Sequence, residues 1–229
     1  MTAYGQFCPV AKAMELLDER WTLLVVRELL MGSRHFNDLR RGVPRMSPAL
    51  LSKRLRALAM AGVVERRHHG GRVAYALTDA GEELRPVVEA LGRWGTRWMA
   101  ELGDEDLDPH VLMWDMHRGL NLDAMPDGRT VLHFQFLEVP KTANRWWWLV
   151  VDEEGVDVCD TDPGHPVTVT VVTPLRALVD LWRGELSWAE AAQRGLRVEG
   201  AGWARRALPR WLRLSVFAPV PRPEREKGP

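Results

Sequence analysis

A dense group of basic side chains in the first third of the sequence has the chemistry to bind phosphates. Ten Lys and Arg residues lie from Arg34 to Arg72, where Asp38 and Glu65 are the acidic residues, so this segment carries a charge of +8. Such side chains neutralise phosphate groups, and arginine also pairs with the O6 and N7 atoms of guanine. The pattern predicts a nucleic-acid-binding surface, whereas a charge run alone equally fits a solvated face.

The elements that must position these charges follow from capping residues and hydrophobic spacing. Ser47 precedes a proline, which is typical of a helix start, and leucines repeat at helical spacing through residues 47–61. Strands over residues 63–67 and 72–77 flank a Gly-Gly turn and predict a β-hairpin. We expect the outer helix face, the turn before it and the hairpin tip to bind DNA through Arg34, Arg45, Ser47, Ala49, Ser52, Lys53, Arg56, Arg67, His68, His69 and Arg72.

The order of the predicted elements is typical of a winged helix-turn-helix domain. Two helices over residues 9–31 and a short helix over residues 36–41 precede the basic helix, and a further helix over residues 79–102 follows the hairpin. The apolar stripe of this last helix contains two tryptophans and is larger than one surface helix needs. The residues of this stripe are Leu84, Val87, Val88, Leu91, Trp94, Trp98 and Leu102.

Several short motifs in residues 5–102 give these elements a family resemblance. The motifs are Cys8–Ala11, Arg20–Leu24, Arg27–Leu29, Arg34–Leu39, Ser47–Leu55, Gly62–Arg66, Tyr75–Gly81 and Leu91–Trp94. Their sequence resembles the HxlR-type branch of the MarR-like winged-helix regulators. The resemblance implies a homodimeric bacterial transcription factor, with dimer contacts from the N-terminal segment and from the apolar stripe of the helix after the hairpin. The two DNA-reading helices of such a dimer, one basic helix from each subunit, lie about 34 Å apart in successive major grooves of a near-palindromic operator.

Cys8 is a candidate redox residue. We expect it at a helix N-terminus, where the helix dipole stabilises a thiolate. Some members of the resembled family sense oxidants or electrophiles through a cysteine at this position. No second cysteine lies nearby in the sequence, so a resolving thiol would come from the partner subunit. The alternative is a small residue packed at the dimer interface.

The zero net charge of the 229-residue chain is the sum of two opposite parts. Residues up to Gly103 include 16 basic and 11 acidic side chains, and the remainder includes 15 basic and 20 acidic side chains. We predict a winged-helix domain over residues 1–103, an acidic linker over 104–109, a second domain over 110–218 and a disordered tail over 219–229. We expect the acidic second domain to lie away from the DNA phosphates.

The composition also argues against several other classes of protein. The longest apolar runs have six residues, which is too short for a membrane span, and the first twenty residues lack a signal-peptide pattern. The chain has two cysteines, one in each predicted domain, so a disulfide framework is not expected. We expect a reduced cytoplasmic protein with no membrane partner.

The second domain has a different sequence character. Four predicted strands rich in β-branched and aromatic residues precede three predicted helices, so the whole chain is of the α+β class, with a mainly antiparallel sheet covered by helices. The segments Val167–Leu178, Leu181–Ala191 and Gly195–Gly200 are similar to the end of sterol-carrier-protein-type domains. This resemblance covers about residues 130–215 and implies an apolar ligand cavity. The candidate lining residues are Trp114, Phe134, Phe136, Trp147, Leu178, Trp182 and Trp188. The alternative is that these side chains are ordinary core residues.

The sequence gives little support for an enzyme. The seven histidines have no cysteine or carboxylate at metal-ligand spacing, and phosphate-loop and Gly-x-Ser-x-Gly motifs are absent. We therefore predict no catalytic residues, metal or cofactor. The main hypothesis is a regulator that binds double-stranded DNA as a homodimer and responds to a hydrophobic small molecule or to Cys8 oxidation. One alternative is a lipid carrier whose winged helix mediates protein contacts, and another is a regulator whose second domain only dimerises or recruits polymerase.

Overall fold

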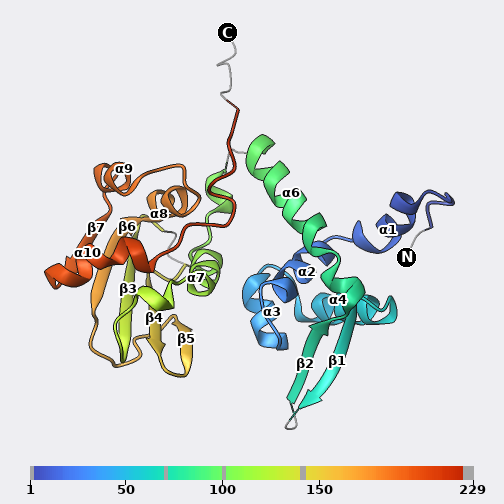
Figure 1. Ribbon diagram of the computed structural model, residues 1–229, viewed down its shortest axis with the longest axis horizontal. Coiled ribbons are helices and arrows are strands. Elements are labelled where there is room, and N and C mark those ends of the chain that lie inside the picture. Colours follow the sequence, from blue (N-terminus) through green and yellow to red (C-terminus); the bar gives the residue numbers. More distant parts are fainter. Residues whose placement is uncertain (1–2, 70–71, 100–101, 140–142, 224–229) are drawn as a thin grey trace. The chain divides into compact units, whose positions relative to one another are not determined.

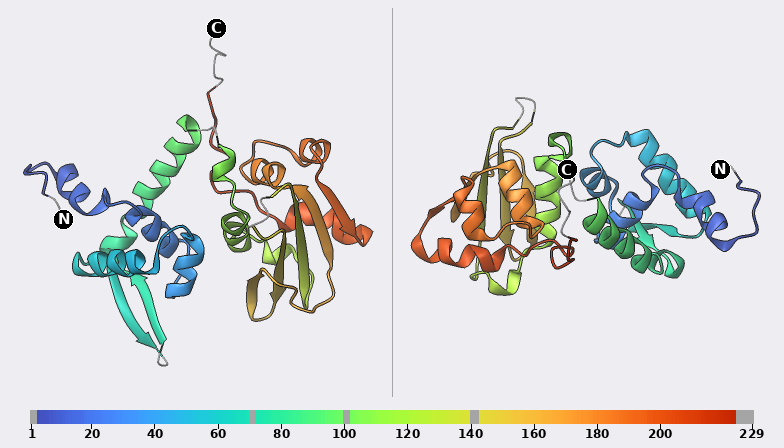
Figure 2. Two further views of the ribbon diagram at one scale, coloured as in Figure 1. Left: turned by 180° about the vertical axis from the view of Figure 1, so that it is seen from behind. Right: turned by 90° about the horizontal axis from the view of Figure 1, so that it is seen from above.

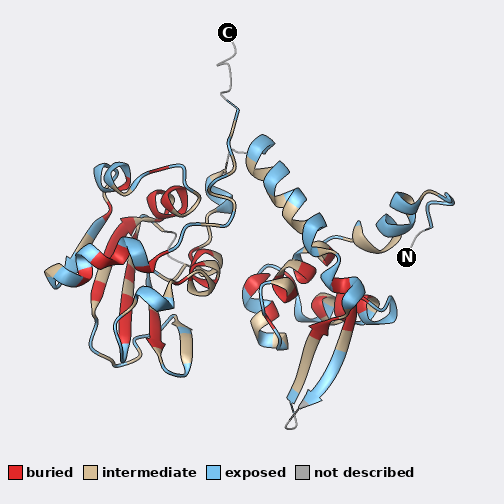
Figure 3. Ribbon diagram, in the orientation of Figure 1, coloured by how far each residue is buried: buried red, intermediate tan, exposed pale blue. Residues whose placement is uncertain are grey.

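The computed structural model describes residues 3–69, 72–99, 102–139 and 143–223, without the side chain of His69. The chain forms two compact units, residues 1–94 and 95–229. The division between the two units falls inside a helix. The predicted domain boundary at Gly103 lies nine residues after this division. Each unit has its own hydrophobic core, shown by the separate groups of buried residues in Figure 3.

The first unit has the element order of a winged helix-turn-helix domain (Figure 1). Buried side chains of α2 and α4, among them Val25, Val26 and Leu51, form its core with residues of α3 and of the hairpin. The antiparallel β1–β2 hairpin projects beyond these helices (Figure 2). The elements are α1 (Pro9–Leu17), α2 (Thr22–Leu30), α3 (Phe36–Gly42), α4 (Pro48–Met60), β1 (Val64–His69), β2 (Arg72–Leu77), α5 (Asp79–Glu82) and α6 (Arg85–Trp98).

The predicted helix over residues 79–102 is instead two helices, α5 and α6. Thr78 caps α5 by accepting a hydrogen bond from the Gly81 amide. Pro86 explains the break, because it has no amide hydrogen for the carbonyl of Glu82 and its ring would collide with that carbonyl in a continuous helix. The second helix ends at Trp98, so Leu102 does not belong to its apolar stripe.

The second unit is a five-stranded sheet covered by helices on one face (Figure 1). The strand order is β5-β4-β3-β6-β7, and β3 with β6 is the one parallel pair among these strands. The prediction of a mainly antiparallel sheet covered by helices is confirmed. The strands are β3 (Thr130–Leu137), β4 (Trp146–Asp152), β5 (Gly155–Cys159), β6 (Val169–Pro174) and β7 (Arg197–Gly200), and the helices are α7 (Pro109–Arg118), α8 (Leu175–Trp182), α9 (Trp188–Gln193) and α10 (Gly202–Trp211), with short 3-10 turns η1 (Asp104–Asp106) and η2 (Leu122–Ala124).

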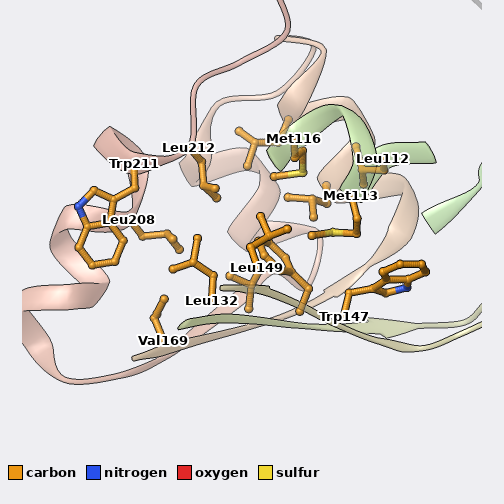
Figure 4. Close-up of a cluster of buried hydrophobic side chains, with 14 of the residues drawn as sticks. Leu112, Met113, Met116, Leu132, Trp147, Leu149, Val169, Leu208, Trp211 and Leu212 are labelled. Atoms are coloured by element: carbon orange, nitrogen blue, oxygen red, sulfur yellow. The ribbon is translucent and has the colours of Figure 1, made fainter. Parts of the chain in front are cut away.

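Side chains that alternate along the strands divide between the two faces of this sheet. Leu132 and Leu149 lie beneath Met113 of α7 and Leu208 of α10 in the main core (Figure 4). Trp147, which is paired with Phe134 in the register, is buried in the same core. Trp146 and Trp148, on either side of Trp147, are more exposed than it is, because successive side chains of a strand point to opposite faces.

The opposite face carries a histidine stacked on one of these tryptophans. The rings of His133 and Trp148 lie 4.8 Å apart, and the Nδ1 atom of His133 lies 3.4 Å from the Oγ1 atom of Thr170. Burial lowers the pKa of His133 below its usual value, although the carboxylate of Asp162 opposes this shift. His133 therefore favours the neutral form in the folded protein.

Candidate nucleic-acid interface

Helix α4 presents one polar face and buries the other. The Ser47 hydroxyl caps the helix by accepting a hydrogen bond from the Leu50 amide at 3.3 Å, and Pro48 begins its first turn. Leu51, Leu55 and Leu58 are buried in the core of the first unit. The opposite side therefore faces outward, and among the predicted DNA-binding residues Ser47, Ala49, Lys53 and Arg56 are exposed while Ser52 is partly exposed.

The turn before α3 is fixed to the wing. The Tyr75 amide of β2 donates to the carbonyl of Arg34 at 2.7 Å, and the Nδ1 atom of His35 lies 3.0 Å from the carbonyl oxygen of Val73. Asp38 accepts a hydrogen bond from the His35 amide and so holds the start of α3. Because of these contacts, the exposed Arg34 lies beside the wing strand rather than on an independent loop.

The wing carries exposed basic side chains on both of its strands. Arg66, Arg67 and His68 on β1 and Arg72 on β2 are exposed, and Arg67 forms an ion pair with Glu65. The predicted contact His69 pairs with Arg72 in the hairpin register, but its side chain lies outside the described part. The exposed Arg45 precedes α4. The structure thus places the predicted DNA-binding side chains that it describes on the reading helix, the turn before it and the wing of one unit.

Arg54 is the exception among the basic residues of this segment. It is buried, donates from Nε to the Arg20 carbonyl at 3.1 Å and forms an ion pair with Glu19. It therefore anchors α4 to the segment before α2 and adds no charge to the outer surface. Its position three residues after Leu51 could have revealed this, because that spacing places it on the inner side of the helix.

Three exposed arginines were absent from the predicted contacts. Arg40 and Arg41 of α3 and Arg66 of β1 are exposed, and all three belong to the segment whose charge first indicated a phosphate-binding surface. The local charge count could have identified them, whereas helix-face reasoning applied to α4 alone could not.

The sequence of the first unit is similar to the sequences of known proteins. Residues 16–102 match the model of the HxlR-like helix-turn-helix family. The HTH-type transcriptional regulator YvaP of Bacillus subtilis is 37% identical over 99 residues, which are 42% of this chain and 92% of that protein. The HTH-type transcriptional regulator sll1512 of Synechocystis is 36% identical over 100 residues, which are 42% of this chain and 74% of that protein. The chain belongs to the HxlR-like helix-turn-helix family.

A protein of known structure is similar to about the same fraction of this chain. The reduced form of the transcriptional regulator YodB from Bacillus subtilis is 30% identical, with 43% of this chain and 100% of that chain covered and a TM-score of 0.37. The HxlR-like match ends at residue 102. Family membership therefore supports DNA binding and transcription regulation through the first unit, and the sterol-carrier resemblance of the second unit is not confirmed.

Helix α6, which follows the wing in this HxlR-like protein, has an apolar stripe that is largely exposed to solvent. Val87, Leu91, Trp94 and Trp98 of α6 repeat at intervals of three and four residues and are all substantially exposed. Two other predicted interface residues, Leu84 and Val88, pack against the core of the first unit. Leu102 packs against the core of the second unit. The available stripe is therefore shorter than predicted but keeps both tryptophans.

The N-terminal segment of the HxlR-like unit also exposes apolar side chains. Phe7 and Val10 flank the partly exposed Cys8, which precedes α1. The Tyr4 hydroxyl donates to the carboxylate of Asp18, which raises the pKa of Tyr4, and this contact holds the segment against α1. Cys8 is thus accessible beside apolar residues, which suits either hypothesis for its role.

The residues predicted to line a ligand cavity lie mainly in the core of the second unit. Five of them are buried and Trp182 and Trp188 are partly buried against the same cluster. Such positions fit the alternative in which these side chains are ordinary core. The five buried residues are Trp114, Phe134, Phe136, Trp147 and Leu178.

The part of the chain that the structure describes offers neither a metal site nor a membrane-spanning helix. No group of three or more His, Cys, Asp or Glu side chains there could hold a metal ion. No helix in that part of the chain is both long and apolar enough to cross a membrane.

Proposed function

We propose that the protein is a homodimeric transcriptional regulator that binds a near-palindromic operator through α4 and the wing of each protomer. The observation that carries this proposal is the exposed basic face of α4, in a unit whose sequence belongs to the HxlR-like family. Ser47 and Ala49 leave room for a close approach to base edges, while Lys53 and Arg56 have the reach and charge for phosphates or guanine.

The wing supports a second set of contacts on the same DNA. Its exposed arginines lie on a hairpin, which suits phosphates or the adjacent minor groove. Arg34 lies beside the hairpin through the hydrogen bond between its carbonyl and the Tyr75 amide. The helix, the turn and the wing would therefore bind as one rigid surface.

Selection of bound sequences from a random DNA pool tests this proposal. We expect enrichment of a two-fold symmetric site with half-sites one helical turn apart. The K53Q/R56Q double variant should bind that site more weakly. For each lost phosphate contact, the slope of log affinity against log salt should become less steep by about 0.9.

An R129Q/R145Q double variant is a charge-matched control, because both arginines are exposed and lie on the second unit. The proposal fails if wild-type protein prefers no DNA sequence, or if its binding is insensitive to salt. That result would favour the alternative in which the winged helix mediates protein contacts in a lipid carrier.

The dimer of this proposal forms through α6 and the N-terminal segment. Exposed Leu91, Trp94 and Trp98 on α6 and Phe7 and Val10 near α1 provide the apolar surface that two copies would bury. A change at this interface alters the spacing of the two reading helices. Oxidation at Cys8 is one such change that we propose, because the residue lies next to this apolar surface.

Binding of a hydrophobic molecule to the second unit is the other proposed control. It acts on DNA binding only if the molecule prefers one spacing of the reading helices over the other. Because most predicted lining residues are buried in the core, binding requires that the core open a cavity. Quenching of tryptophan fluorescence by a cell lipid extract, with operator affinity measured in parallel, tests this form of control.

A further inference from the structure

The negative charge of the second unit is unevenly distributed. The twenty residues 194–213 contain six arginines and one acidic residue, Glu199. The rest of residues 104–229 contains nine basic and 19 acidic side chains. The net charge of −5 for residues 104–229 is thus the sum of +5 in residues 194–213 and −10 in the remaining residues. The expectation that the whole domain is repelled by phosphates rested on its net charge and does not hold for this segment.

Three of these arginines lie on the exposed face of helix α10. Ala204, Ala207, Leu208 and Trp211 are buried in the core of the unit, at the spacing of one helix face. The exposed residues of the other face are Arg205, Arg206, Pro209 and Arg210, with a half-exposed Trp203 at its edge. We name Arg205, Arg206 and Arg210 the α10 basic face.

The helix that carries this face is fixed in place at its C-terminal end. The Trp211 Nε1 atom donates to the Ala124 carbonyl at 2.8 Å, and the Asn121 side chain donates to the carbonyl of Arg210 at 3.1 Å. Arg213, just beyond the helix, donates to the Oδ1 atom of Asn121 at 2.6 Å. Leu120 and Leu212 also form a β-bridge. The arginines are therefore presented by a rigid element, which lowers the entropic cost of binding a partner.

The α10 basic face differs from six other arginines of its unit in how its charge is compensated. Those six form ion pairs, as Arg118 does with Asp115 and Arg176 with Asp104. Within the described ranges, the side chains of the three face residues form no ion pair or hydrogen bond. Asp123 is the acidic residue of the adjacent turn η2, and it forms no ion pair with them. The three guanidinium groups thus remain available for an external anion.

We propose that the α10 basic face binds the sugar-phosphate backbone of DNA that flanks the operator. Guanidinium groups pair with phosphate oxygens in a two-pronged geometry, and DNA presents phosphates in a regular row. A membrane surface fits less well, because the apolar side of α10 is already buried in the core and cannot enter lipid. This inference rests on the proposed operator binding and adds a non-sequence-specific contact to it.

The test compares two lengths of DNA with the full-length protein. One fragment spans only the selected operator, and the other extends it by about two helical turns on each side, or roughly 20 base pairs. Affinity is measured by fluorescence anisotropy over a series of salt concentrations, and the protected region is mapped by hydroxyl-radical footprinting. The variant is R205Q/R206Q/R210Q, and the control R129Q/R145Q/R197Q removes the same charge from exposed positions elsewhere on the unit.

On the long fragment, the α10 variant should have a salt slope less steep than wild type by about 0.9 for each lost phosphate contact, or about 2.7 for each engaged protomer. Its footprint should shrink to the operator. On the short fragment the variant and wild type should bind alike, and the control should follow wild type on both. Equal melting temperatures of all three proteins would show that these exposed changes leave the fold intact.

The proposal is overturned if the α10 variant keeps the wild-type slope and footprint on the long fragment. It is also overturned if the control loses as much affinity as the variant, because general charge would then explain the effect. Operator binding that persists in either case leaves the proposed regulator function standing. Absence of binding by wild-type protein to any fragment would instead be a failure of that function itself.

Discussion

Replacing Trp94 with serine should dissociate the proposed dimer while leaving each protomer folded. Trp94 is 55% exposed, and a tryptophan presents up to about 250 Å² of surface, so about 140 Å² is available for burial. At roughly 25 cal/mol per Å² its burial contributes at most about 3.5 kcal/mol in each protomer. Aromatic anchors of interfaces typically contribute about 2 kcal/mol, because association costs offset part of the area term.

A two-fold interface contains this tryptophan twice, so the substitution should weaken dimerisation by about 4 kcal/mol, or roughly a thousandfold in the dissociation constant. Sedimentation velocity over a concentration series measures that constant directly. Trp146→Ser is the matched control, because Trp146 is 47% exposed and begins β4 of the second unit. Thermal melts of both variants check that the folded units persist.

A dissociation constant for Trp94→Ser within about threefold of wild type would refute the assignment of the dimer interface to α6, since threefold corresponds to about 0.7 kcal/mol. An equal loss in Trp146→Ser would refute it as well, because the effect would then follow from removing any exposed tryptophan. Loss of the melting transition would show instead that Trp94 supports the fold of its own unit.

Three further predictions concern single residues. Gly42→Ala should cost about 3 kcal/mol of stability in a denaturant titration, because the added methyl would lie 1.9 Å from the carboxyl carbon of the buried, ion-paired Glu28, whereas Gly95→Ala has open space and should be neutral or slightly stabilising. Because burial lowers the pKa of His133 below 6.5, the unfolded chain takes up the proton first, so stability present above pH 6.5 should fall as the pH decreases below it. His133→Phe should flatten that dependence in melts at different pH, and an unchanged slope would contradict the assignment. Cys8→Ser should retain operator binding in the presence of oxidant, whereas continued release by this variant would exclude Cys8 as the sensor.

Local chemistry was sufficient to predict most of the first unit. The Ser-Pro start of α4, its leucine spacing and the Gly-Gly turn each act over a few residues, and the structure has helix α4 and the β1–β2 hairpin where they were expected. Arg54 could not be assigned to the interior from charge alone. Its partner Glu19 lies 35 residues away in the sequence and meets it only after α4 packs against the segment before α2.

The second unit depended more strongly on tertiary structure. Its strands and helices could be predicted from β-branched residues and caps, because these preferences are local. The parallel pairing of β3 with β6 and the burial of most predicted pocket residues could not, since both depend on which segments pack together.

By itself, the sequence determined the winged-helix order, the basic reading helix and the cancellation of charge between the two parts of the chain. Tertiary structure decided which of those charges remain available. It buries Arg54 with Glu19, pairs Arg176 with Asp104, and leaves the arginines of α10 outward on an anchored helix. The physical reason is that charge is a property of composition, whereas its compensation depends on distances between residues that only the fold brings together.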